Sequence, residues 1–160
     1  MWVALLRAVN LGSRNKVPMA RLRAAMEDAG YADVRTVIAS GNVVFERSRP
    51  SAAALERLIA AEFGVESTVI LRSAAQIGAL VAAKPFDANA YVAFTAAAPR
   101  RLTALNGLDP YTVVGRDLVL HFPGGYTNAR LTGAVIEKRL GILVTVRNWN
   151  TVEKLAALVS

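Results

Sequence analysis

The sequence predicts an α+β fold in which the order strand–helix–strand–strand–helix–strand occurs twice, and three observations support it. Apolar runs of strand length alternate with segments whose apolar residues recur at helical spacing. Two pairs of β-rich runs are joined by turn sequences, Ser40-Gly41-Asn42 and Gly115-Arg116-Asp117. Helix-capping residues and glycines bound the helical segments. This order is typical of the split βαβ, or ferredoxin-like, fold, so we expect two ferredoxin-like subdomains in tandem with mostly antiparallel sheets.

The first copy is predicted over residues 1–72. Its elements are, in order, a strand over 2–9, a helix from Pro18 to Gly30, a hairpin over 34–46, a helix from Ser51 to Gly64 and a strand over 66–72. Proline fits the first turn of a helix because the N–H that it lacks would go unpaired there. Serine is a favoured N-cap, and glycine readily adopts the left-handed conformation in which many helices end.

A linking helix is predicted within residues 73–89, where Ser73 and Gln76 are spaced as a capping box and Lys84-Pro85 ends the helix. The second copy and a terminal helix are predicted over residues 90–160. Their elements are, in order, a strand over 91–96, a helix over 98–107, a hairpin over 111–122, a helix that begins at Thr127 or Asn128, a strand over 142–146 and a terminal helix with a capping box of Asn150 and Glu153. The two copies share this order and not their sequences.

Composition indicates a soluble globular protein of the cytoplasm. The chain has 160 residues, of which 54% are hydrophobic and 19% charged, so it can bury a substantial core. It has no cysteine, which excludes disulfides and thiolate chemistry, and its single histidine argues against a His-based metal site. The apolar N-terminal run is too short for a signal peptide, and no stretch is long enough to span a membrane. We expect no metal and no cofactor.

The first strand is apolar on both faces, which is unusual for a split βαβ sheet with helices on one side. Its two faces carry Trp2, Ala4, Leu6 and Ala8 on one side and Val3, Leu5 and Val9 on the other. We therefore expect the open faces to pack on each other, on the linking elements or across a homodimer. A covered sheet cannot serve as a nucleic-acid platform, and Phe45 alone does not make the aromatic pattern of RNA-binding sheets.

The chain carries a formal net charge of +7, which favours anionic partners. Before the first acid, Glu27, the sequence contains Arg7, Arg14, Lys16, Arg21 and Arg23. One interpretation is an anion site in which cations lie beside a helix N-terminus and Gly12 allows close approach of the backbone. The alternative is a solvated surface loop whose asparagines form turns.

Further candidates lie at the ends of other predicted strands. Arg147 ends an apolar strand as Arg7 does, and Asn148 lies at the following strand-to-helix junction, where Trp149 is best explained as an anchor for the last helix. The glycine pair in residues 121–130 fits either a weak anion-binding motif or an ordinary hairpin exit loop. His121 is better explained as a hydrogen-bonded strand residue than as a general base.

Three functions follow as hypotheses. The first is binding of an anionic small molecule or a phosphate group, in a pocket lined by Arg7, Asn10, Arg14, Lys16, Arg147 and Asn148. The second is a structural role as an oligomeric scaffold, built through the doubly apolar sheet. The third is nucleic-acid binding through charge alone, with little sequence preference. No nucleophile or catalytic base stands out, so the sequence leaves open whether the chain is an enzyme.

The two ends of the chain resemble a known family. Residues 4–45, "ALLRAVNLGSRNKVPMARLRAAMEDAGYADVRTVIASGNVVF", and residues 145–158, "TVRNWNTVEKLAAL", are similar to the bacterial DUF1697 proteins, a family of unknown function. The matching positions are Leu6, Arg7, Asn10, Lys16, Met19, Leu22, Arg23, Ser40, Gly41, Asn42, Val43, Arg147, Asn148, Trp149, Asn150, Thr151 and Leu155. The resemblance implies a cytoplasmic α+β protein with two ferredoxin-like subdomains, and it implies no activity. Ala8 and Ser13 replace two glycines of the family's first loop, which argues against close approach of a ligand to the backbone there.

Overall fold

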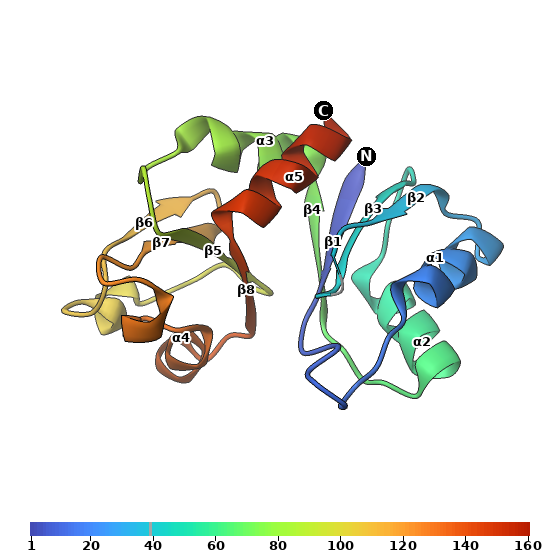
Figure 1. Cartoon of the computed structure of the whole chain (residues 1–160), viewed down its shortest axis with the longest axis horizontal. Coiled ribbons are helices and arrows are strands. Elements are labelled where there is room, and N and C mark those ends of the chain that lie inside the picture. Colours follow the sequence, from blue (N-terminus) through green and yellow to red (C-terminus); the bar gives the residue numbers. More distant parts are fainter. Residues whose placement is uncertain (39) are drawn as a thin grey trace. The chain divides into compact units, whose positions relative to one another are not determined.

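The computed structural model describes residues 1–38 and 40–160. These residues form two four-stranded antiparallel sheets and five α-helices, together with two short 3-10 helices (Figure 1). The predicted α+β class with two antiparallel split βαβ sheets is thereby confirmed. No helix among the described residues has the length and apolarity needed to cross a membrane.

The first sheet has the strand order β2-β3-β1-β4, in which every neighbouring pair is antiparallel. Its elements are β1 (Trp2–Leu6), α1 (Met19–Asp28), β2 (Ala32–Thr36), β3 (Asn42–Glu46), α2 (Ala52–Phe63) and β4 (Val69–Ser73). Strand β1 is central, because Trp2 lies opposite Phe45 of β3 on one side and Ser73 of β4 on the other.

The second sheet repeats this topology with the order β6-β7-β5-β8. Its elements are β5 (Ala90–Thr95), η1 (Leu102–Leu105), β6 (Tyr111–Val114), β7 (Asp117–His121), η2 (Tyr126–Asn128), α4 (Gly133–Leu140) and β8 (Val144–Asn148). A helix follows the last strand of each sheet, and these two helices are α3 (Ala74–Ala83) and α5 (Trp149–Val159).

The chain divides into two compact units. Unit 1 comprises Met1–Ile77 and Lys154–Ser160, and unit 2 comprises Gly78–Glu153. Both α3 and α5 therefore contribute residues to each unit. The predicted division into a first subdomain over 1–72, a linking helix within 73–89 and a second subdomain with the terminal helix over 90–160 stays a prediction.

The core of unit 1 lies between its sheet and helices α1 and α2, which Figure 1 shows on the same side of the sheet. Strand residues Ala4, Leu6, Val43 and Phe45 and helix residues Leu22, Met26, Leu55 and Ile59 form it. Val3, Leu5 and Val44, on the opposite face, are also fully buried. Burial on both faces agrees with the apolar character of both sides of the predicted strand.

Several predicted helix boundaries are confirmed by the hydrogen bonds that make them. The hydroxyl of Ser51 accepts from the N–H of Ala54 at 3.2 Å, and Gly64 ends α2 in the left-handed conformation. Ser73 and Gln76 form the predicted reciprocal capping box, with distances of 2.8 and 3.2 Å. These predictions hold because a cap depends on residues that are close in sequence.

Other predicted boundaries are wrong in ways that the backbone explains. The helix expected over 98–107 is the short 3-10 helix η1, and Arg101 immediately before it has a left-handed φ of 56°. The helix expected from Thr127 or Asn128 begins at Gly133, where Thr132 is the N-cap. The carboxylate of Asp109 accepts from the N–H of residues 130 and 131 and holds that segment outside the helix.

The ends of two strands also differ from prediction. Strand β1 ends at Leu6 instead of residue 9, and Ala8 beyond it has a positive φ of 59° that a strand does not allow. Strand β8 runs to Asn148 instead of 146. The N-cap of α5 is therefore Asn148, whose Oδ1 accepts from the N–H of Thr151 at 2.8 Å, and not the predicted Asn150.

The turn between β2 and β3 brings the backbone of Gly41 against β1. A Cβ at Gly41 would lie 2.7 Å from the side chain of Val9 and 2.9 Å from that of Leu6, and its φ is +87°. Asn42 donates from Nδ2 to the carbonyl of Val37 at 3.0 Å, which supports the predicted turn. Ala39, which precedes the predicted turn within the hairpin over 34–46, lies outside the described residues.

We expect Gly41→Ala to lower the free energy of unfolding by about 2 kcal/mol or more, because it adds a steric overlap to an unfavourable φ. Gly12→Ala is the matched control: its φ is +59°, but a Cβ there meets nothing within 4 Å. The control should lose about 1 kcal/mol. Urea denaturation of both variants measures this difference, and equal losses would contradict the close approach at Gly41.

Candidate functional site

The loop between β1 and α1 is closed at its base by the side chain of Asn10. Its Nδ2 donates to the carbonyl of Val17 at 3.0 Å, and its Oδ1 accepts from the N–H of Val17 at 2.8 Å. Asn15 adds a bond from its Nδ2 to the carbonyl of Ala8 at 3.0 Å. The amide of Asn10, a predicted ligand-binding group, therefore holds the loop in shape.

The tip of this loop carries two of the predicted cations. Leu11 and Arg14 exchange two backbone hydrogen bonds, of 3.1 and 2.9 Å, and both Arg14 and Lys16 are exposed. Arg7, at the start of the loop, is half-buried. Its backbone is hydrogen-bonded to the two residues before β4. The N–H of Arg7 donates to the carbonyl of Thr68 at 2.9 Å, and the carbonyl of Arg7 accepts from the hydroxyl of Ser67 at 2.7 Å.

A groove of about 590 Å³ runs beside this loop. Asn10, Gly12, Lys16, Val17, Pro18, Met19, Thr36 and Ile38 line it. Helix α1 begins at its wall with Pro18 as N-cap, which gives no side-chain cap, and no acidic residue occupies the first turn. The first N–H groups of an α-helix have no partner within the helix, so this helix start is suited to an anion.

The remaining predicted residues, Arg147 and Asn148, end β8 in unit 2. Arg147 is 8% exposed, and its guanidinium donates to the hydroxyl of Thr145 and to the carbonyl of Val146. Burial lowers the pKa of Arg147 to about 10, which leaves it protonated at neutral pH. Asn10, Arg14 and Lys16 thus share one loop of unit 1, and a pocket common to all six predicted residues stays a prediction.

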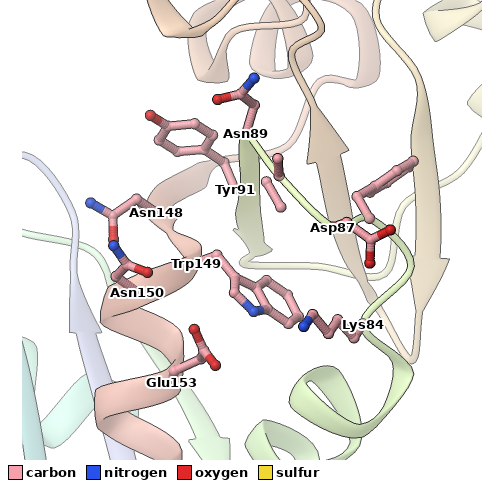
Figure 2. A pocket seen from close by; sticks show the side chains of 11 residues that line it. Lys84, Asp87, Asn89, Tyr91, Asn148, Trp149, Asn150 and Glu153 are labelled. Carbon is pink, nitrogen blue, oxygen red and sulfur yellow. The ribbon is translucent and has the colours of Figure 1, made fainter.

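Unit 2 contains a cavity of about 320 Å³ that the sequence pattern does not predict. Figure 2 shows its walls, which are the segment before and at the start of β5 and the first residues of α5. Lys84, Phe86, Asp87, Ala88, Asn89, Ala90, Tyr91, Asn148, Trp149, Asn150 and Glu153 line it. The polar residues between Lys84 and Asn89 are visible in the sequence. No pattern of neighbouring residues, however, predicts that this segment lies opposite Trp149.

Trp149, which lines this cavity, has an indole donor without a partner. Its Nε1 is buried, and within residues 1–38 and 40–160 it has no hydrogen-bond partner. Nearly all buried polar groups in proteins are hydrogen-bonded, so this N–H is an exception to the usual pattern. The predicted role of Trp149 as a helix anchor does not account for this donor.

His121 supports one wall of the cavity. Its Nδ1 lies 2.8 Å from the carbonyl oxygen of Ala88, and its ring stacks on Phe86 with centroids 5.0 Å apart. Because a carbonyl only accepts, Nδ1 carries a proton in this contact. The prediction of a hydrogen-bonded strand histidine is confirmed. Within the described part of the chain, no three His, Asp or Glu side chains are grouped so that they could hold a metal ion.

We expect Asn10→Ala to lower the free energy of unfolding by about 2 kcal/mol, because it leaves both the N–H and the carbonyl of Val17 without their partner. Ser13→Ala at the exposed tip of the same loop is the control, and its change should stay within about 0.5 kcal/mol. Chemical denaturation compares the two. If Asn10→Ala were as stable as the wild type, the hydrogen bonds between Asn10 and Val17 would not hold this loop in shape.

Comparisons with known proteins agree with this structure. The chain is similar to the conserved bacterial protein SP0830 from Streptococcus pneumoniae, with a TM-score of 0.71 and 21% sequence identity, over 99% of this chain and 98% of that one. At this identity the likeness shows a shared fold alone. No curated protein matches the sequence. Residues 1–113 match the family described as Protein of unknown function (DUF1697). The chain therefore belongs to the DUF1697 family.

Proposed function

We propose that the chain binds an anionic small molecule, or a phosphate group on a larger one, in the groove beside the first turn of α1. The observation that carries this proposal is the combination of Lys16 with a helix start that has neither a side-chain cap nor an acid. Cations and unpaired helix N–H groups both stabilise an anion placed between them. Of the described residues that line the groove, none carries a carboxylate.

Two of the cations in and after the loop form ion pairs, and two others have none among the described residues. Arg21 pairs with Glu62 at 3.3 Å, and Arg23 pairs with Glu27 at 2.9 Å. Among the described residues, no carboxylate lies within ion-pair distance of Arg14 or Lys16. An anion bound here therefore competes with no neighbouring acid for these two side chains.

The loop is also ordered before any ligand arrives. Its base is held by the Asn10–Val17 pair and its tip by the Leu11–Arg14 bridge. A loop that is already fixed loses little conformational entropy on binding, which favours affinity. Arg7, Arg147 and Asn148 stay predicted contributors to anion binding.

We expect inorganic phosphate and adenosine monophosphate to bind saturably, and Lys16→Ala to weaken that binding about tenfold, because it removes a charge-assisted hydrogen bond. Arg14→Ala should weaken it too. Arg57→Ala, an exposed cation of the same unit on α2, is the matched control and should bind like the wild type. Isothermal titration calorimetry at low salt measures all four proteins.

Two results would contradict this proposal. One is the absence of saturable binding of either probe to the wild-type chain. The other is an equal loss of affinity in Lys16→Ala and Arg57→Ala, which would indicate a diffuse charge effect instead of a site.

A further inference from the structure

We propose that the cavity of unit 2 is a second binding site, and that its ligand is a small, uncharged molecule rich in hydroxyl groups, such as a monosaccharide. This site lies entirely within Gly78–Glu153, whereas the groove of the proposed anion site lies within unit 1. The proposal is independent of the anion groove, because the two linings share no residue.

The unpaired indole N–H of Trp149 is the first argument. The atom is buried in the wall of a cavity large enough for a small ligand. A buried donor without a partner costs stability, and an oxygen of a bound molecule would recover it. The ligand must therefore present a hydrogen-bond acceptor close to Trp149.

The charges of the cavity are the second argument, because they oppose a simple anion. Lys84 contributes one positive charge, whereas Asp87 and Glu153 contribute two negative ones. Within the described residues, none of these three side chains has a hydrogen bond or an ion pair. Carboxylates accept hydrogen bonds and an ammonium donates them. A ligand that bonds to all three side chains must therefore both donate and accept hydrogen bonds.

Hydroxyl groups meet this requirement, since each can donate one hydrogen bond and accept others. The side-chain amides of Asn89 and Asn150 also offer both a donor and an acceptor at the cavity. A molecule with several hydroxyls can therefore satisfy every polar group of the lining without bringing in a net charge. An ion of either sign would face at least one group of its own sign.

The shape of the cavity is the third argument. Figure 2 shows the indole of Trp149 extending toward Lys84, with Glu153 and Asn150 on the other side of the tryptophan. The flat face of an indole is an apolar surface, which suits the C–H face of a sugar ring, while polar side chains around it reach the hydroxyls. The volume of about 320 Å³ lies at the small end of ligand sites, which favours a single ring over a longer chain.

Saturation-transfer NMR and calorimetric titration test this inference, with D-glucose, D-ribose and N-acetyl-D-glucosamine as probes and with glycine and inorganic phosphate as charged comparisons. We expect at least one sugar to bind saturably. Trp149→Phe keeps an aromatic ring and removes the N–H, so it should weaken that sugar about three- to tenfold. Glu153→Gln and Asp87→Asn, two exposed substitutions, should weaken it as well.

Asp28→Asn, an exposed carboxylate at the end of α1, is the matched control and should not change sugar binding. Lys16→Ala should not change it either, because that residue belongs to the other site. Thermal melting of each variant confirms that it is folded.

Three outcomes would overturn the inference. Saturable binding of no sugar removes the ligand class, and so does binding of glycine or phosphate at this cavity in preference to the sugars. Sugar binding that Trp149→Phe, Glu153→Gln and Asp87→Asn all leave unchanged removes the cavity as its location.

Discussion

The direct passage from a strand into a helix, without an intervening loop, is the constraint on which this structure depends. Ser73 is both the last residue of β4 and the cap of α3, and Asn148 is both the last residue of β8 and the cap of α5. Each junction fixes the direction in which its helix leaves the sheet, because the cap bonds the helix while its backbone still pairs in the strand. At the second junction Trp149 follows Asn148 directly as the first residue of α5, and its side chain lines the cavity.

The polar features of the molecule gather where regular structure stops. The β1–α1 loop holds its shape through asparagine side chains, and several of its residues have positive φ. Among the residues that the structure describes, no carboxylate lies within ion-pair distance of its exposed cations Arg14 and Lys16. The segment before β5 contributes Lys84 and Asp87 to the cavity, and the start of α5 contributes Glu153 and Trp149, whose Nε1 has no partner among the described residues. Sites that lie on a rigid scaffold and are formed by connecting segments are common in proteins. The excess of positive charge is therefore relevant to the groove beside the β1–α1 loop, whereas the cavity of unit 2 has charges of both signs.

The sequence predicted the parts of this fold that depend on neighbours along the chain. Apolar runs and turn residues located the strands. Ser51, Ser73 and Gln76 located two helix starts, since a cap bonds to the backbone within a few residues. It misplaced the start of α4, because Asp109 holds the preceding segment from a distant part of the chain. It missed the cavity for the same reason. Residues 84–91 and 148–153 meet through sheet pairing, as in the register of Tyr91 with Asn148, and no local pattern encodes that meeting.

A high-resolution crystal structure of the ligand-free chain tests whether the β8–α5 junction leaves a buried donor without a partner. We expect Asn148 to cap α5 and the Nε1 of Trp149 to have no acceptor from the chain within 3.5 Å, with any contact to it made by water or a bound molecule. An indole turned so that Nε1 donates to a carbonyl or carboxylate of the chain would contradict this arrangement and remove the basis for a ligand in the cavity.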